Sequence, residues 1–254
     1  MSSKLSVVII TFNEERNIER CLKSVQNIAD EIIVVDSFST DNTVSICNKY
    51  DAKLHQEKWL GYSEQKNLAN NLAQHELIFS IDADEAVSPE LEQSILEIKE
   101  SATKNTAFKI KRLTNYCGNW IHHCGWYPDS KLRIWFKEEA KWEGEIHETV
   151  KFNNKDVNVE TLNGDLLHYS FYTIDEHLNV INKFSSLKAN KDFNKGKGTN
   201  LIKILFKPCI KFLIMYFLKL GILDGYYGFV VCKNSAFSEH LKQVKLKELT
   251  KNAR

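Results

Sequence analysis

Two aspartates, Asp82 and Asp84, are the residues of this chain whose types and spacing most directly allow chemistry. They follow a mostly apolar run at 77–81, which predicts a buried parallel strand ending where the charges begin. Residues two apart in an extended segment point the same way, so both carboxylates can face one small volume. Like charges held there repel unless a cation lies between them, and oxygen ligands suit a divalent cation. The pair therefore indicates a metal site, and the alternative is a solvated turn before a helix that starts at Ser88-Pro89.

The elements that position these aspartates follow from the pattern of the first hundred residues. Apolar runs predict strands at 5–10, 31–36, 52–55 and 77–81. Apolar positions at helical spacing predict helices after residue 17, near residue 44 and at 63–73. This alternation is typical of a doubly wound parallel sheet, in which ligands bind at the carboxyl edge. The sequence therefore predicts an α/β fold with the aspartates at that edge.

Polar residues also follow the first two predicted strands: Thr11, Asn13 and Glu14 after the first, and Asp36 after the second. Such acceptors suit a base and a ribose, as an acidic residue does after the second strand of dinucleotide folds. Neither Gly-x-Gly-x-x-Gly nor Gly-x-x-x-x-Gly-Lys-Ser/Thr follows the first strand, which argues against dinucleotide oxidoreductases and P-loop enzymes. A nucleotidyltransferase would need a Gly-rich, basic loop at 11–15, where this chain has Thr-Phe-Asn-Glu-Glu.

The pattern changes after residue 100. Segments 107–113 and 131–136 alternate apolar and polar positions, as half-exposed strands do. A long, aromatic, Gly-containing loop at 115–129 joins them, and loops of this size in compact domains are usually functional. We predict that the aromatic residues form walls of an acceptor site, with core packing as the alternative: Trp120, Trp126, Tyr127 and Trp142. The cysteine and histidine spacing at 117–124 fits no common structural zinc pattern.

Bulk composition is that of a globular protein with no affinity for nucleic acid. The chain has 254 residues, 43% hydrophobic and 26% charged, with a formal net charge of +1. That balance argues against disorder and against electrostatic binding of nucleic acid. Six cysteines and an N-terminus without a signal-peptide pattern lead us to expect reduced thiols in a cytoplasmic protein.

The segment 195–254 is basic and amphipathic. Its apolar stretch 201–220 carries Lys203, Lys207, Lys211 and Lys219, and charges at that density argue against a membrane span of ~20 apolar residues. Lysines four apart beside apolar side chains are typical of a helix that lies on an anionic membrane surface. We predict peripheral membrane contact; the alternative is a basic helix packed on the catalytic domain with its lysines in water.

Three sequence blocks in order resemble the opening of the inverting glycosyltransferases of family 2: residues 7–14, 33–43 and 81–85. The resemblance implies a GT-A fold and a nucleotide-sugar donor. Later segments resemble the branch that adds glucose to the inner core of bacterial lipopolysaccharide: 125–129, Arg133, 144–148 and Asp224-Gly225. We accordingly expect a catalytic domain at 1–194, with a nucleotide-sugar half at 1–100 and an acceptor half at 101–170, before the membrane-associating region.

The resemblance assigns roles to residues already singled out. Asp36 would bind the uracil edge and Asp82 the ribose of a UDP-sugar, beside Thr11, Asn13 and Glu14. Asp84 would ligate Mg²⁺ or Mn²⁺ that bridges the diphosphate. His147 is a candidate to complete the metal shell, because an imidazole suits Mn²⁺ better than Mg²⁺, and the alternative is a purely structural histidine. Lys66 and Arg133 are candidate diphosphate contacts, with solvated surface charge as the alternative.

Inversion requires a general base that takes the proton of the acceptor hydroxyl. Family 2 enzymes usually supply an aspartate from an acidic pair in the second half of the domain. Here Asp129 stands without an acidic neighbour after Pro128, so it is the first candidate and Glu148 is the competing base.

These observations together predict a cytoplasmic, metal-dependent transferase on the cytoplasmic face of the inner membrane. It would move one hexose, glucose from UDP-glucose, onto a heptose of a lipid A-anchored core. The Gln-x-x-Arg-Trp signature and membrane helices of polymerising family members are missing, which favours a single addition. The alternatives are a family 2 transferase with another lipid-linked or capsule acceptor, and a non-catalytic nucleotide-sugar-binding module.

Overall fold

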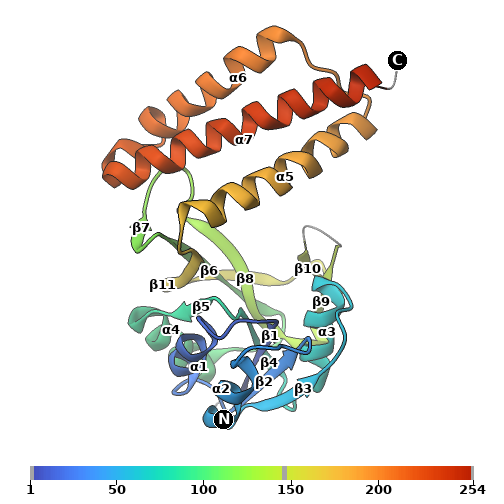
Figure 1. Ribbon diagram of the computed structural model, residues 1–254. Helices are drawn as coiled ribbons and strands as arrows, with labels where there is room; N and C mark the ends of the chain where they lie inside the picture. The colour runs from blue at the N-terminus through green and yellow to red at the C-terminus, as the bar shows by residue number, and fades with distance from the viewer. Residues whose placement is uncertain (1–2, 145–147, 253–254) are drawn as a thin grey trace. The chain divides into compact units, whose positions relative to one another are not determined.

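The computed structural model describes residues 3–144 and 148–252 and consists of two compact units (Figure 1). The first, here called the sheet unit, comprises Met1–Arg112 and Asp129–Tyr169. The second, the helical unit, comprises Leu113–Pro128 and Ser170–Arg254. The chain therefore leaves and re-enters the sheet unit, and each unit is built from segments that are distant in sequence.

The parallel half of the sheet places the predicted site residues at one edge. Strand β1 (Leu5–Thr11) pairs in parallel with β2 (Glu31–Asp36) and with β4 (Leu77–Asp82), and β2 pairs with β3 (Lys53–Gln56). The register sets Thr11 opposite Asp36 and Ile10 opposite Asp82. The strands run to a common carboxyl edge because all four are parallel, so the polar residues that end them meet there.

The other half of the sheet is antiparallel, and it brings later segments to the same strands. The sheet order is β3-β2-β1-β4-β8-β6-β11-β5. The added strands are β5 (Glu85–Val87), β6 (Thr106–Tyr116), β8 (Asp129–Phe136) and β11 (Asn158–Phe171), while β7 (Asn119–Ile121) pairs with β6. A separate hairpin joins β9 (Ala140–Glu143) to β10 (Thr149–Phe152). The predicted α/β fold is confirmed.

Four helices accompany the sheet: α1 (Ile18–Val25), α2 (Thr43–Cys47), α3 (Tyr62–Leu72) and α4 (Pro89–Ser101). Short 3₁₀ turns follow α2 at Asn48–Tyr50 and β8 at Lys137–Glu139. The apolar positions of α1 at helical spacing are fully buried, as the sequence predicts. Helix α4 begins at the predicted cap, where the Ser88 hydroxyl accepts the Leu91 N–H at 3.3 Å and Pro89 occupies the first turn. In contrast, α3 buries a polar face that includes Lys66 and Asn70, which indicates that it serves the site more than the core.

The helical unit contains α5 (Ile174–Asn194), α6 (Leu201–Leu213) and α7 (Gly225–Asn252), with α7 packed against both of the others (Figure 1). A π-helical turn at Ile214–Leu218 and a 3₁₀ turn at Gly221–Asp224 connect α6 to α7. A capping box between Thr173 and Glu176 starts α5. The buried positions of α5 recur at multiples of four residues and form the stripe that packs on α7, so α5 groups with α6 and α7 although the sequence places it in the catalytic domain. Across 3–144 and 148–252, no helix has the length and apolar content needed to cross a membrane.

Candidate active site

Asp82, the last residue of β4, lies between two buried cations. Its carboxylate oxygens are 2.9 Å from Lys66 Nζ and 2.7 Å from Arg133 Nη2. The side chains of both cations are almost fully buried, whereas that of Asp82 is 28% exposed. Burial raises the pKa of Asp82, but Arg133 and Lys66 more than offset it and hold the pKa well below its usual range. Asp82 is therefore a fixed, ionised acceptor with one open side.

A chain of alternating charges extends from Asp82 in both directions. Arg133 Nη2 also contacts Glu85 Oε1 at 2.6 Å, and Arg112 Nη1 lies 3.5 Å from the same oxygen. Arg112 donates to Asp129 Oδ2 through Nε at 3.1 Å and Nη2 at 2.7 Å. On the other side of Asp82, Lys66 reaches Glu148 at 3.3 Å. The series reads Asp129, Arg112, Glu85, Arg133, Asp82, Lys66 and Glu148, so every charge has an opposite neighbour, as buried charges require.

Burial of Lys66 and Arg133 shows that the alternative of solvated surface charges is wrong for both. Lys66 projects from the polar face of α3, and its ammonium also lies 4.6 Å from the ring centroid of Trp142. Trp142 is itself buried and packs edge-on against Trp135 at 5.6 Å. The pKa of Arg133 is raised: burial lowers it, but Asp82 and Glu85 outweigh that effect. Both cations thus hold the carboxylates of the sheet edge in place.

Asp84 contacts a histidine that the sequence analysis does not identify. Its carboxylate lies 3.1 Å from Nε2 of His168, which β11 carries opposite Glu85. A carboxylate and an imidazole suit Mn²⁺. Within the residues that the structure describes, no group of three or more histidine, cysteine or acidic side chains forms a metal site. Divalent ions in phosphate-transfer sites commonly take one or two protein ligands and fill the remainder with substrate phosphates and water, so this pair fits such an ion.

The pKa of a further carboxylate, that of Glu14, is also affected by the aspartates at this edge. Burial raises the pKa of Glu14, and Asp84, Asp41 and Asp82 raise it further, whereas a hydrogen bond from Asn17 opposes the rise. A cation beside Asp84 would relieve this repulsion. The charge balance at Asp84 therefore agrees with the Asp84–His168 pair in favouring a bound divalent ion.

The loops after β1 and β2 are joined by side-chain hydrogen bonds. Asp36 is buried, and its carboxylate accepts the Ser39 N–H at 2.9 Å, the Ser39 hydroxyl and the Gln56 amide at 3.1 Å. Asn13, at φ 54°, receives the Thr40 N–H on its side-chain oxygen at 2.8 Å. Thr11 Oγ1 is buried and has no hydrogen-bond partner among the described residues. An unsatisfied hydroxyl at the end of β1 suits a site that a ligand completes.

The remaining predicted residues lie elsewhere or are not described. Trp120, Trp126 and Tyr127 belong to the helical unit, where Trp126 packs edge-on against Tyr116 at 5.9 Å. That contact matches the core-packing alternative for Trp126, and the acceptor role of the four aromatic residues stays a prediction. His147 lies outside the described residues.

Three residues of the site escape sequence reasoning: Glu85, Arg112 and His168. Glu85 directly follows the Asp-x-Asp pair, in a position typical of an acidic residue before a helix. It is nevertheless buried, and burial raises its pKa. Arg112 ends an alternating segment, a position that usually faces water. His168 occurs in an ordinary strand pattern 84 residues after Asp84. Glu85 is next to Asp84 in the sequence and only its burial is unexpected, whereas strand pairing alone brings Arg112 and His168 to the site, so the linear pattern carries no signal for those two.

The fold and the site define a GT-A glycosyltransferase. The family model described as Glycosyl transferase family 2 matches residues 6–153, so the chain belongs to glycosyltransferase family 2, as predicted. The mannosyltransferase PcManGT of Pyrobaculum calidifontis, solved with GDP-Man and Mn²⁺, shares the fold with a TM-score of 0.55 at 15% identity, covering 97% of this chain and 87% of that one.

Curated relatives extend over almost the whole chain. An uncharacterized glycosyltransferase of Rickettsia typhi (strain ATCC VR-144 / Wilmington) is 35% identical over 99% of this chain and 89% of its own length. The lipopolysaccharide core biosynthesis glycosyltransferase LpsC of Rhizobium meliloti (strain 1021) is 30% identical over 95% of this chain and 91% of its own. The predicted likeness to transferases of the lipopolysaccharide core is thereby confirmed, and the protein is a glycosyltransferase.

Proposed function

We propose that this enzyme transfers one hexose, glucose from UDP-glucose, with inversion onto a heptose of the lipopolysaccharide core. The observation that carries the proposal is the carboxyl edge of the sheet, where Asp82 is held ionised by Lys66 and Arg133 and Asp84 meets His168. The relative named for lipopolysaccharide core biosynthesis supports the choice of acceptor. Asp36 and Asp82 are the proposed contacts of the uracil and the ribose, with Thr11, Asn13 and Glu14 around them.

Asp84 and His168 are the residues that would hold the divalent ion, with His147 of the undescribed segment as a further candidate. When bound, Mg²⁺ or Mn²⁺ neutralises the charge that develops on the diphosphate leaving group. Lys66 and Arg133 keep Asp82 ionised and oriented, so the ribose is positioned without any rearrangement of the sheet edge. The protein's contribution is thus a preformed cradle for the nucleotide.

Asp129 is the proposed general base. As the acceptor oxygen attacks the anomeric carbon from the face opposite the diphosphate, its proton passes to the carboxylate, and the sugar–phosphate bond breaks with its electron pair going to UDP. A carboxylate offers about four acceptor positions. Arg112 takes two on Oδ2, and Lys131 lies 2.9 Å from Oδ1, so one position on Oδ1 is left for the acceptor hydroxyl.

Glu148 is the second candidate base, because it borders Asp82 through Lys66. Variants of the two residues separate these candidates. Burial raises the pKa of Asp129, but Lys131 and Arg112 lower it overall, so an enzyme that uses Asp129 should keep kcat/KM level down to low pH. Rates of Asp129→Asn and Glu148→Gln across pH 4–8 then identify the base as the residue whose loss removes turnover at every pH while UDP still binds.

The experiment that tests the function is a panel of UDP-sugars incubated with Mn²⁺, with Mg²⁺ and with EDTA, with and without a heptose-containing core acceptor, reading released UDP. Metal-dependent release from UDP-glucose, accelerated by the acceptor, is expected. Release only with a different lipid-linked or capsule acceptor would support the alternative substrate. Tight UDP binding without turnover under any condition would leave the non-catalytic binding module.

We also propose that the enzyme contacts the cytoplasmic face of the inner membrane through α6 and the turn that follows it. Large apolar side chains there are exposed, including Leu201 at 68%, Phe206 at 59% and Leu218 at 78%, and they alternate with lysines. Such a surface suits anionic lipid. Phe206→Ser with Leu218→Ser should reduce sedimentation with phosphatidylglycerol vesicles, whereas Leu72→Ser, at an exposed position of the sheet unit, should not. Equal sedimentation of all three proteins would exclude the contact.

A further inference from the structure

The helical unit contains a cavity of about 730 Å³ between its three long helices. Each helix presents one face to it, as the spacing of the lining residues shows. Helix α6 contributes positions 207, 210 and 211 and the π-helical turn that continues it contributes 214, while α7 contributes 235, 238, 239 and 242. Both sets follow the i, i+3, i+4, i+7 pattern of a single helical face. Helix α5 adds 177, 181 and 188, so the cavity is a product of how the three helices pack.

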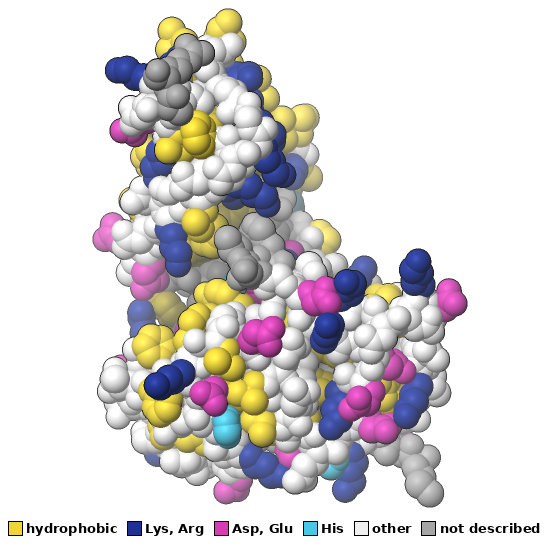
Figure 2. Space-filling view, turned by 90° about the vertical axis from the view of Figure 1, so that its right-hand side faces the viewer, with side chains coloured by type: hydrophobic (Ala, Val, Ile, Leu, Met, Phe, Trp, Pro, Cys, Tyr) yellow, Lys and Arg dark blue, Asp and Glu magenta, His cyan; other side chains and the backbone are white. Residues whose placement is uncertain are grey.

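The charge of this cavity is strongly positive. Its lining contains five lysines and one glutamate, Glu239. Lys242 is paired with Asp192 at 2.7 Å. In the described part of the chain, the other four ammonium groups have no ion pair or hydrogen bond: Lys188, Lys207, Lys211 and Lys219. Figure 2 shows lysine side chains gathered beside hydrophobic ones on the helical unit.

Lys211 shows the effect of this crowding. Its pKa is lowered by burial and, beyond that, by the charges of Lys188, Lys242 and Lys219, with only Glu239 acting in the opposite direction. Lys188, Lys207 and Lys219 are exposed to water, whereas Lys211 is partly buried, so a bound anion would chiefly relieve the repulsion at Lys211. The uncompensated charge therefore points to an anionic ligand.

The remaining lining groups specify the ligand further. Ser235 and Ser238 place hydroxyl donors along α7, and hydroxyls together with lysines are common phosphate partners. Ile181 and Met215 supply a buried apolar wall, and Ile210 of α6 and Ile214 of the following turn remain partly exposed at the rim. We propose that this cavity binds the phosphate group of an anionic amphiphile, with the phosphate on the lysines and the attached apolar body against the isoleucines. A bilayer phospholipid and a phosphorylated lipid-linked saccharide share this chemistry.

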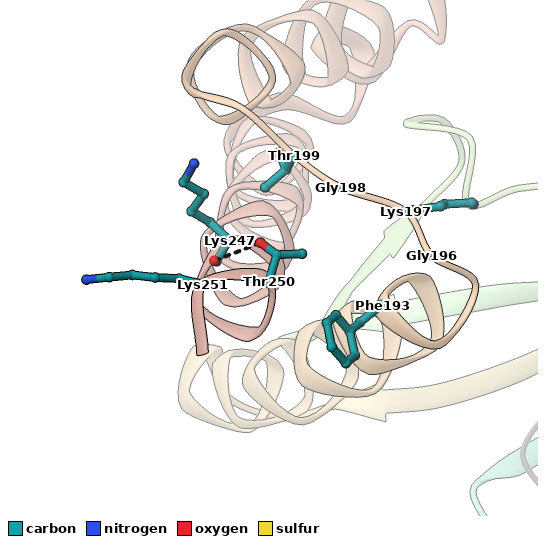
Figure 3. A pocket seen from close by; sticks show the side chains of 8 residues that line it. All are labelled: Phe193, Gly196, Lys197, Gly198, Thr199, Lys247, Thr250 and Lys251. Carbon is teal, nitrogen blue, oxygen red and sulfur yellow. Dashed lines mark hydrogen bonds between the residues drawn. The ribbon is translucent and has the colours of Figure 1, made fainter. Parts of the chain in front are cut away.

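A second cavity in the helical unit, of about 520 Å³, provides a comparison for the lysines of the first cavity. It is also lined by lysines, but Lys197 is paired with Asp192 at 2.9 Å. Figure 3 shows Lys247 and Lys251 extending away from Gly196 and Gly198, and Thr250 Oγ1 already donates to the Lys247 carbonyl at 2.9 Å. These lysines therefore serve as matched controls for the cavity between the helices.

The test measures binding by calorimetry to the full-length protein, without turnover, so its outcome is independent of the proposed transfer reaction. The probes are dihexanoyl phosphatidic acid below its micelle concentration, glycerol 3-phosphate and inorganic phosphate. The expected order is phosphatidic acid tightest, by about tenfold over glycerol 3-phosphate, because only it fills the apolar wall. Lys188→Gln with Lys211→Gln should weaken phosphatidic acid binding at least about tenfold.

The control pair, Lys247→Gln with Lys251→Gln, removes the same charge from the helical unit and should leave affinity within about twofold. Thermal unfolding of both doubles verifies that they fold. Equal weakening by the two pairs, or no binding of phosphatidic acid to the parent protein, would overturn the proposal. Equal affinity for inorganic phosphate and phosphatidic acid would overturn the proposal that the ligand is an amphiphile and would indicate a site for free phosphate. If a glucosamine-phosphate glycolipid competes with phosphatidic acid, the ligand is a phosphorylated lipid-linked saccharide. If it does not compete, the ligand is a phospholipid.

Discussion

Charged side chains are arranged differently in the two units of this chain. In the sheet unit, Lys66 and Arg133 are buried, and each contacts two carboxylates in an unbroken alternating series. In the helical unit, Lys207 and Lys211 line a cavity without a carboxylate contact among the described residues. Buried charge in the first unit is compensated by the protein itself, whereas charge in the second is left for something else to compensate.

This difference in charge compensation distinguishes residues that hold other side chains in position from residues that are proposed to bind a ligand. Asp82 is fully compensated and is held in one orientation, which suits its proposed role as an acceptor for a ribose hydroxyl. Asp84 has His168 beside it and other carboxylates nearby, and the proposed divalent ion would compensate its charge. The lysine cavity requires the reverse, a bound anion. An uncompensated group therefore marks where each unit meets its ligand.

The largest effect is expected at Asp84. Asp84→Ala removes the proposed carboxylate ligand of the ion that would neutralise the leaving group, so turnover should fall about a thousandfold or more. Released UDP measures the effect, and circular dichroism should show an unchanged fold. Activity within tenfold of the parent would contradict the assignment of Asp84 as a metal ligand. His168→Gln, the matched change on the neighbouring strand, should chiefly raise the Mn²⁺ concentration needed for half-maximal rate.

Breaking the alternating series should cost folding free energy. Arg133→Met leaves Asp82 and Glu85 without their shared cation, and removal of one partner of a buried ion pair costs about 3–5 kcal/mol. Urea unfolding measures this loss. Adding Glu85→Gln to the same protein should restore part of it, because one buried charge then disappears. If the double variant were no more stable than Arg133→Met, Glu85 would not be held by Arg133.

The helical unit should respond to pH through His177, which is buried and whose pKa is lowered by that burial from 6.5 to about 4. Between those values the unfolded chain binds the proton and the folded chain does not, so stability falls as pH drops from 6.5 to 4, by about 3 kcal/mol. Urea unfolding of the parent and of His177→Gln across this range gives the difference. Parallel curves for the two proteins would show that His177 titrates normally.

The smallest effect is expected at the start of α5. Thr173→Ala removes the hydroxyl that accepts the Glu176 N–H at 3.1 Å, and loss of an N-cap costs about 1 kcal/mol. The same change at Asn200, which caps α6 by accepting the Lys203 N–H at 2.9 Å, is a matched comparison in the same unit. Denaturant midpoints report both losses. A Thr173→Ala midpoint equal to that of the parent would show that the capping box does not stabilise α5.

Much of the sheet unit can be predicted from its sequence because local rules determine it. Apolar runs specify β1, β2 and β4, and the helical spacing at 18–25 specifies the buried face of α1. Parallel strands share a carboxyl edge, so the placement of Asp36 and Asp82 at one edge follows once their strands are predicted to be parallel. The Thr173–Glu176 capping box likewise depends only on residues three apart.

The tertiary structure determines which side chains contact one another in the site and in the cavity. Pairing of β11 with β5 brings His168 to the site, and pairing of β6 with β8 sets Arg112 opposite Asp129, across separations that no local pattern encodes. The same is true of Lys207 and Lys211: the sequence reveals a lysine stripe, but the packing of α6 on α7 beside α5 forms the cavity that they line. Local chemistry specifies which groups can act, and long-range packing decides which of them meet, because contact between distant residues depends on how the whole core closes.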